Sequence, residues 1–173
     1  RGPGSHLASF ASETLAIWGT VQAAQATLRS SRCGAVNSVM EPEQDRASLD
    51  RMMAHVSERW NIDTSHILLT GMSDGGTFTY LAGLPEGPFT HLAPVSSAWH
   101  PMLLGAANPT RLNGLPIYIT HGALDWMFAA DMARLAYSEL SAAGADVTYR
   151  EIADLSHTYP AEENTRIMNW FLG

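Results

Sequence analysis

The sequence predicts a protein of the α/β class, in which helices cover both faces of a parallel sheet. Short β-branched and apolar runs alternate along the chain with segments whose apolar residues recur at helical spacing. Hydrophobic residues make up 46% and charged residues only 16% of the 173 residues, as expected for strands buried on both faces. A chain of this length is expected to form one domain, covering residues 1–173.

About five strands are expected in this three-layer arrangement. They correspond to residues 35–40, 67–70, 92–96, 115–119 and 147–152. Helices are expected at residues 43–59, 76–82, 128–143 and 160–172, and residues 6–28 have mixed helical character. In the first of these helices, the residues expected to face the core are Leu49, Met52, Met53, Val56 and Trp60. Pro94 weakens the third strand because it has no N–H to donate.

The net charge bears on the kinds of partner, and the cysteine content bears on the cellular compartment. The 10 basic and 17 acidic residues give a net charge of −7 without a basic stripe, which disfavours nucleic acid and polyanionic substrates. Cys33 is the only cysteine, so no internal disulfide forms, as is usual in a reducing compartment. The sequence has no run of transmembrane length and no signal-peptide pattern. A cytoplasmic location is therefore expected, although a processed secreted form would look the same.

The most informative motif is G-x-S-x-G at residues 71–75, centred on Ser73. It follows the apolar run 67–70 and precedes the helical segment 76–82. This context is that of a nucleophile elbow, a sharp strand-to-helix turn that holds a serine Oγ above the sheet. Glycines two residues either side of the serine allow the strained turn and the close approach of strand and helix. The pentapeptide alone also fits an ordinary glycine-rich turn.

An acid and a histidine follow two later strands. Asp125 comes just after the strand at 115–119, and His157 comes just after the strand at 147–152. The chain order Ser73, Asp125, His157 is the order found in α/β-hydrolases. Three weak signals in the right order and context together favour a catalytic triad.

These segments resemble the α/β-hydrolase-fold serine esterases of the phospholipase/carboxylesterase and polyhydroxybutyrate-depolymerase-like type. The resemblance runs from about Val36 to Phe171 and includes the approach to the elbow from Trp60, the loop His121–Trp126 and the pair Ser156–His157. It implies Ser73 as nucleophile, Asp125 as acid and His157 as base, with no cofactor. It does not imply a particular ester.

The chain departs from this family at its N-terminal side, where the usual fold has more strands than this sequence supplies. The fold is therefore expected to be a reduced variant, and an open sheet edge offers a second copy a place to pair. Residues 1–5 read either as a remnant of expression or as the remainder of a glycine-rich oxyanion loop.

Stabilising the tetrahedral oxyanion requires hydrogen-bond donors. The backbone N–H of Asp74, directly after the nucleophile, is the first candidate, and the second is expected near Gly4 and Ser5. The Asp74 side chain either orients the elbow or caps the helix that follows.

Position along the chain also suggests substrate-binding residues, which would form an apolar wall for an acyl or aryl group. The candidates for this wall are Trp99, Trp126, Met127 and Tyr159, and His100 is a separate candidate for contact with the substrate. The spacing of His121 and Asp125 is compatible with a metal, but the sequence offers no third ligand, so no metal is expected.

The sequence therefore favours a serine esterase acting on carboxylic esters of small or medium acyl chain. Two alternatives remain open. A thioesterase, lactonase or peptidase would use the same triad. A catalytically weak hydrolase-like domain for binding or assembly would agree with the shortened N-terminal side.

Overall fold

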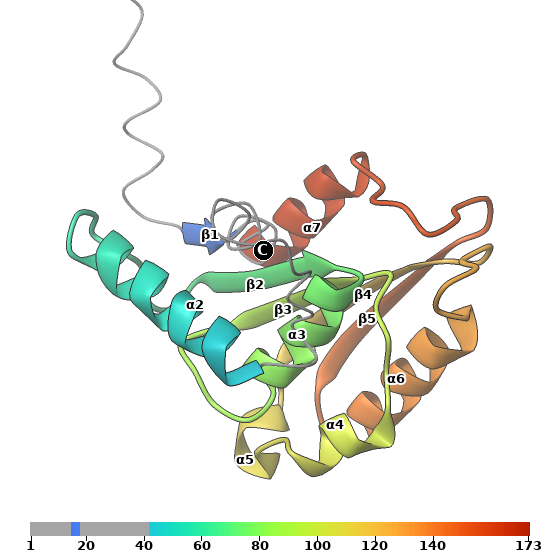
Figure 1. Cartoon of the computed structure of the whole chain (residues 1–173), viewed down its shortest axis with the longest axis horizontal. Coiled ribbons are helices and arrows are strands. Elements are labelled where there is room, and N and C mark those ends of the chain that lie inside the picture. The colour runs from blue at the N-terminus through green and yellow to red at the C-terminus, as the bar shows by residue number, and fades with distance from the viewer. Residues whose placement is uncertain (1–14, 18–41) are drawn as a thin grey trace, which may run out of the picture.

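Figure 1 shows the computed structural model, which describes residues 15–17 and 42–173. Strands alternate with helices along this part of the chain. The strands are β1 (Leu15–Ile17), β2 (Ile67–Met72), β3 (His91–Val95), β4 (Pro116–Gly122) and β5 (Asp146–Ile152). The helices are α2 (Pro42–Ser57), α3 (Asp74–Gly83), α4 (Pro101–Gly105), α5 (Pro109–Leu112), α6 (Ala130–Ala142) and α7 (Glu163–Leu172).

The described strands form one sheet in the order β1-β2-β3-β4-β5, and every neighbouring pair is parallel. All carboxyl ends therefore lie at the same edge of the sheet, where ligands bind in folds of this kind. Pro94 lies within the central strand β3. The β3–β4 ladder is interrupted between Leu92 and Val95, because Pro94 has no N–H to donate.

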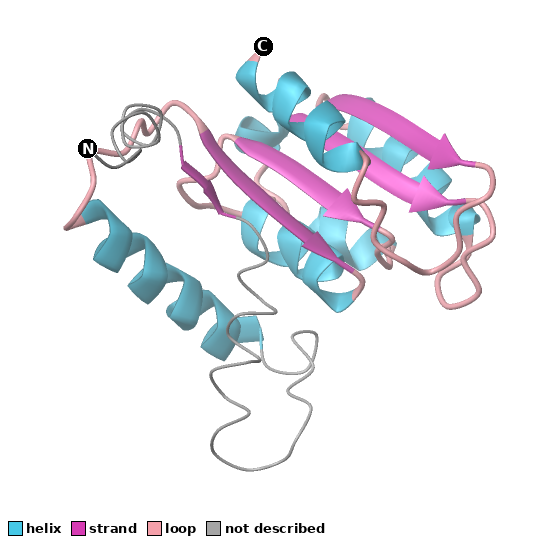
Figure 2. Cartoon of the chain, turned by 90° about the horizontal axis from the view of Figure 1, so that it is seen from above, coloured by secondary structure: helices cyan, strands magenta, loops and turns pink. Residues whose placement is uncertain are grey.

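Helices cover both faces of the sheet, which gives three layers (Figure 2). Alternate residues of each strand point to opposite faces. Ile67 and Leu69 of β2 join the larger apolar core under α2, α3 and α6, whereas Leu68 joins a smaller core under α7. The smaller core contains Leu68, Ala93, Val95, Tyr118, Ile167 and Phe171. The predicted three-layer parallel architecture is confirmed.

The N-terminal side differs from the expectation. The strand expected at residues 35–40 lies outside the described residues. The first strand of the sheet is instead Leu15–Ile17, within the region expected to be helical, so that expectation is wrong for these three residues. Their backbone pairs in parallel with residues 67–69 of β2. These residues form a strand because they pair with residues some fifty positions away in the sequence. A pattern of neighbouring residues does not predict such pairing.

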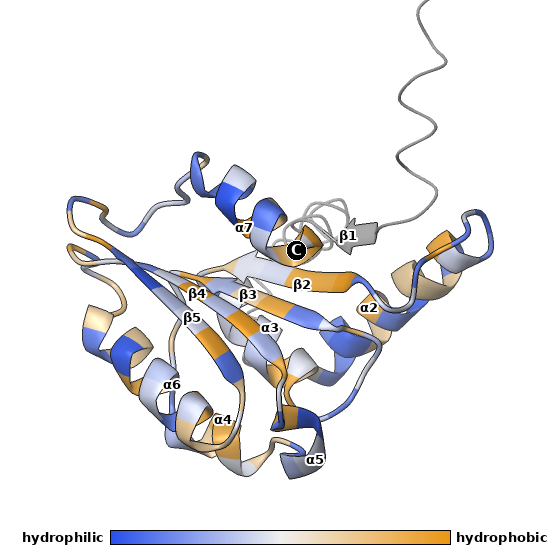
Figure 3. Cartoon of the chain, turned by 180° about the vertical axis from the view of Figure 1, so that it is seen from behind, coloured by the Kyte–Doolittle hydropathy of each residue, from blue (hydrophilic) through white to orange (hydrophobic). Residues whose placement is uncertain are grey.

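Figure 3 shows apolar residues along much of β2, whereas the helices combine apolar and hydrophilic residues, as expected for helices that pack one face on the sheet. In α2, Leu49 is buried as expected. Trp60 lies beyond the end of α2 and is 56% exposed, so its expected place in the core is wrong. Among residues 15–17 and 42–173, no helix is long and apolar enough to cross a membrane.

Candidate active site

Ser73 lies in the sharp turn between β2 and α3. Its backbone has φ 59° and ψ −124°, a conformation that residues other than glycine rarely adopt. Hydrogen bonds on both sides hold it: the Ser73 N–H donates to the Val95 carbonyl at 3.0 Å, and the Ser73 carbonyl accepts from the Thr77 N–H at 3.0 Å. The sheet and the helix together therefore impose the strained turn that presents Oγ.

Gly71 of the motif and Gly76 directly after it allow close contacts at the turn. A Cβ on Gly71 would lie 2.5 Å from the carbonyl carbon and oxygen of Gly75. A Cβ on Gly76 would lie 2.7 Å from Cβ of Ser97. Because real Cβ atoms do not approach backbone so closely, a side chain at Gly71 would open the turn.

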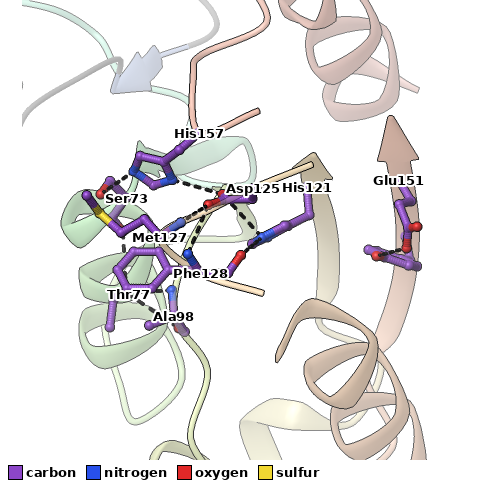
Figure 4. A network of polar contacts seen from close by, with 10 residues as sticks. Ser73, Thr77, Ala98, His121, Asp125, Met127, Phe128, Glu151 and His157 are labelled. Atoms are coloured by element: carbon purple, nitrogen blue, oxygen red, sulfur yellow. Dashed lines mark hydrogen bonds and ion pairs between the residues drawn. The ribbon is translucent and has the colours of Figure 1, made fainter. Parts of the chain in front are cut away.

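The structure brings Ser73, His157 and Asp125 together from the carboxyl ends of three strands (Figure 4). His157 Nε2 lies 3.0 Å from Ser73 Oγ, and His157 Nδ1 lies 2.8 Å from Asp125 Oδ2. The two ring nitrogens thus contact the serine and the acid on opposite sides of the imidazole. This is the geometry in which a histidine accepts a proton from a serine while a carboxylate orients it.

Asp125 is held by donors on both of its oxygens. Oδ1 accepts from the backbone N–H groups of Met127 and Phe128, each at 2.9 Å, and Oδ2 accepts from His157. The side chain is 0% exposed. Burial raises the pKa of Asp125, but the hydrogen bonds from His157, Phe128 and Met127 outweigh it, and the net pKa lies below the usual value. The carboxylate is therefore ionised at neutral pH.

The loops that carry Asp125 and His157 are joined along their backbones. The Leu124 N–H donates to the Leu155 carbonyl at 3.0 Å. Gly122 makes this contact possible, because a Cβ at that position would lie 2.3 Å from the same carbonyl oxygen. The rings of Trp126 and Phe128 lie edge-on to the His157 ring, with centroids 6.1 and 5.5 Å away.

Asp74 is the first residue of α3, so its backbone N–H has no acceptor within the helix. The expected oxyanion donor thus lies directly after Ser73, at the positive end of the helix dipole. The cap position of α3 belongs to Ser73, and Asp74 sits one residue inside the helix. The second expected donor, near Gly4 and Ser5, lies outside the described residues.

Two of the expected substrate-binding residues lie beside the His157 ring and open to solvent. Trp126 is 73% exposed and Met127 is 46% exposed. Leu124, which sequence reasoning did not single out, is 62% exposed on the same loop. The loop that carries Asp125 therefore exposes three large apolar side chains.

The other three expected substrate-binding residues make different contacts. Trp99 is a core residue, 4% exposed, whose indole N–H donates to Glu139 at 2.7 Å; its expected place in the pocket wall is wrong. His100 is exposed and accepts from the Met102 N–H at the start of α4. Tyr159 packs against the smaller core, where burial and then the charge of Glu163 raise the pKa of Tyr159 to about 12.

Sequence reasoning missed how His121 takes part in this network. Its ring is fully buried, and Nε2 lies 2.9 Å from the Phe128 carbonyl oxygen and 3.4 Å from Asp125 Oδ2 (Figure 4). The spacing of four residues between His121 and Asp125 was the available signal. Among the described residues, no three His, Cys, Asp or Glu side chains are grouped so as to hold a metal ion.

Comparison with known proteins identifies the fold. No protein-family model and no curated protein matches the sequence at a significant level. Among solved structures, esterase PE8 is similar with a TM-score of 0.61 and 18% identity, over 82% of this chain and 66% of that one. Arabidopsis thaliana SOBER1 has a TM-score of 0.56 and 21% identity over 83% and 67% of the two chains. A carboxylesterase from Mesorhizobium loti has a TM-score of 0.60 and 20% identity over 75% and 60%.

The chain therefore has the α/β-hydrolase fold, and the resemblance inferred from the sequence is confirmed at this level. This chain spans 60 to 67% of the lengths of these three solved structures.

Proposed function

We propose that the protein is a serine hydrolase that cleaves carboxylic esters of small or medium acyl chain through an acyl-enzyme on Ser73. The observation that carries the proposal is the pair of His157 contacts, 3.0 Å to Ser73 Oγ and 2.8 Å to Asp125 Oδ2. Solved neighbours described as esterases, as a carboxylesterase and as an acylaminoacyl peptidase support hydrolysis of an ester or peptide bond.

In the proposed reaction, Ser73 Oγ adds to the ester carbonyl carbon while His157 Nε2 takes the hydroxyl proton. The same nitrogen then gives this proton to the leaving alcohol, and the acyl group remains on Ser73. Water attacks the acyl-serine in the second half, again losing a proton to His157, and the proton returns to Ser73 as the acid leaves. Asp125 fixes the Nδ1–H tautomer and stabilises the imidazolium formed in each half.

The oxyanion of each tetrahedral intermediate is assigned to the backbone N–H of Asp74. Loss of one such donor typically costs about 10² to 10³ in rate. The second donor is expected from the N-terminal segment near Ser5. The fixed N–H of the helix start costs no reorganisation during the reaction, which favours this assignment.

The exposed surface beside the triad favours an apolar acyl or aryl group. Trp126, Met127 and Leu124 present apolar side chains on the loop that carries Asp125. Thioesters, lactones and peptides pass through the same chemistry, so kcat/KM across a panel of these substrates separates the alternatives.

The test is hydrolysis of a short-chain p-nitrophenyl ester by the wild type, Ser73→Ala and Ser65→Ala, with EDTA present. Ser65 also contacts an aspartate and a histidine, so it is the matched control. Ser73→Ala is expected to lose at least about 10³-fold in kcat, and Ser65→Ala to keep wild-type turnover. Turnover that survives in Ser73→Ala contradicts the proposal.

A fluorophosphonate probe separates an enzyme from a binding domain. Stoichiometric labelling of the wild type that disappears in Ser73→Ala supports a serine hydrolase whatever its substrate. A wild type that is folded by circular dichroism but takes up no probe supports a domain used for binding or assembly.

A further inference from the structure

Three of the four large apolar side chains on the loop that carries Asp125 are exposed, and only Phe128 is partly buried. Leu124, Trp126 and Met127 are 62%, 73% and 46% exposed. Apolar burial of these three side chains therefore contributes little to fixing the loop. The Leu124 N–H holds the start of the loop through the Leu155 carbonyl, and the Asp125 carboxylate and His121 hold the turn that follows.

His121 holds the far end of this loop. Its Nε2 lies 2.9 Å from the carbonyl oxygen of Phe128, and the N–H of the same Phe128 donates to Asp125 Oδ1 at 2.9 Å. A carbonyl oxygen only accepts, so Nε2 must carry the proton in this contact. The same N–H lies 3.4 Å from Asp125 Oδ2, the oxygen that accepts from His157.

The burial of His121 has a free-energy cost, and the hydrogen bond made by Nε2 offsets part of it. The ring is 0% exposed, and its Nδ1 has no hydrogen-bond partner in the described part of the chain. An apolar side chain of similar size would fill the same space without leaving a buried polar atom unpaired. The hydrogen bond to the Phe128 carbonyl is the contact that such a side chain would lose.

We propose that His121 is a positioning residue for the triad, which holds the Asp125–Phe128 turn so that the carboxylate points at His157. This proposal rests on the proposed function. A continuous set of contacts runs from the buried strand β4 through the Phe128 peptide and Asp125 to His157 and Ser73 (Figure 4). His121 touches none of the reacting atoms and acts through Asp125.

Three substitutions separate the donor from the bulk of the ring. In His121→Gln, the amide nitrogen reaches the place of Nε2 and can still donate to the Phe128 carbonyl. In His121→Asn the shorter amide reaches only the place of Nδ1, and His121→Leu has no donor. His91→Leu, at the amino end of β3, is the control for replacing a partly buried histidine.

We expect His121→Leu and His121→Asn to lower kcat for a p-nitrophenyl ester by about 10- to 100-fold with KM within about twofold, because a misaligned group costs turnover rather than binding. His121→Gln should recover to within about fivefold of the wild type, since it restores the donor. His91→Leu should keep wild-type kcat. Equal kcat in the wild type and His121→Leu, or equal losses in His121→Gln and His121→Leu, overturns the proposal.

Proton NMR tests the same role without any substrate. The N–H shared by His157 and Asp125 should give a downfield resonance in the wild type and in His121→Gln that is shifted or lost in His121→Leu. An unchanged resonance in His121→Leu overturns the proposal even if no ester is ever hydrolysed. If the wild type hydrolyses no ester but the resonances behave as expected, the proposed function is wrong and the positioning role of His121 is supported.

If His121→Leu and His121→Asn do not fold, a measurement on the wild-type protein still tests the proposal. A nitrogen–proton correlation spectrum of protein with isotopically labelled histidine should show the His121 proton on Nε2. A proton on Nδ1 instead rules out donation to Phe128 and overturns the proposal.

Discussion

In the described part of the chain, two aspartate–histidine pairs of nearly equal length lie in very different settings. His157 Nδ1 lies 2.8 Å from Asp125 at the carboxyl edge of the sheet, and His66 Nδ1 lies 2.9 Å from Asp63 just before β2. Both carboxylates also accept backbone N–H groups from residues two or three positions ahead. Each pair even has a serine within hydrogen-bonding distance of its histidine, Ser73 in one and Ser65 in the other.

The direction of the contacts separates the two pairs. His157 uses Nδ1 for the acid and Nε2 for the serine, so a proton taken from the serine is stabilised from the far side of the ring. In the other pair, Nδ1 of His66 faces both Asp63 and Ser65. One nitrogen cannot hold a donated hydrogen bond to the acid and accept the serine proton at the same time.

Burial separates them as well. The side chains of His157 and Asp125 are 9% and 0% exposed, whereas those of His66 and Asp63 are 43% and 37% exposed. Water screens the second pair and weakens its attraction, so exposed pairs of this kind contribute little. A short aspartate–histidine distance is therefore not enough to define a site; ring direction and burial decide it.

The largest expected effect that sharpens this comparison is on turnover. Asp125→Asn should lower kcat by about 10³ to 10⁴-fold, because the amide can leave His157 in the wrong tautomer. Asp63→Asn should leave kcat unchanged. The measurement is steady-state ester hydrolysis by the two variants at one pH; similar kcat values for both would remove the distinction between the pairs.

The second effect concerns the close approach of the Asp125 loop to the His157 loop at Gly122 and Leu155. Gly122→Ala places a Cβ 2.3 Å from the Leu155 carbonyl oxygen and should push the two loops apart. We expect a loss of about 1 to 3 kcal/mol in the free energy of unfolding and about 10-fold or more in kcat. Gly105→Ala, with nothing within 4 Å of its Cβ, is the matched control. Urea unfolding and kinetics of both variants check this, and a neutral Gly122→Ala would contradict the role given to this contact.

A smaller effect is expected at Trp126, whose ring lies beside the first pair. Trp126→Ala should raise KM about fivefold for esters with an apolar acyl group, since part of one indole face is lost. Trp60→Ala, which removes an exposed indole three positions before Asp63 in the sequence, should leave KM unchanged. Comparing KM for acetate and hexanoate esters checks the assignment. A chain-length preference that Trp126→Ala leaves intact would place the acyl group elsewhere.

The smallest effect is the pH dependence of stability. The pKa values of Asp125 and Asp63 both lie below the usual value in the folded protein. Both carboxylates therefore stabilise the fold above about pH 4, and this contribution is lost as pH falls through the folded pKa. The stability lost on acidification should be smaller in Asp125→Asn than in the wild type. Salt should weaken the contribution of exposed Asp63 more than that of Asp125. Urea unfolding across pH and salt tests both statements.

The sequence predicted those parts of the molecule that local patterns determine. Ser73, Asp125 and His157 each follow a strand and lie next to glycine or a turn, so their order and context were enough to anticipate that they meet. Trp99 was misplaced because its partner Glu139 is 40 positions away and no local pattern reports it. The strand Leu15–Ile17 was missed for the same reason, since its pairing with β2 is not local.

The order of the strands in the sheet also bears on how the chain assembles. Each strand after β1 pairs with the one before it in sequence, so the sheet can grow from one end to the other. Ser73, the proposed nucleophile, follows the early strand β2, but His157 lies 84 positions further on and follows β5. A chain that ends before β5 therefore lacks the residue proposed to activate Ser73. Under the proposed function, reaction of Ser73 with a fluorophosphonate probe should report only molecules in which β5 and the loop after it have folded.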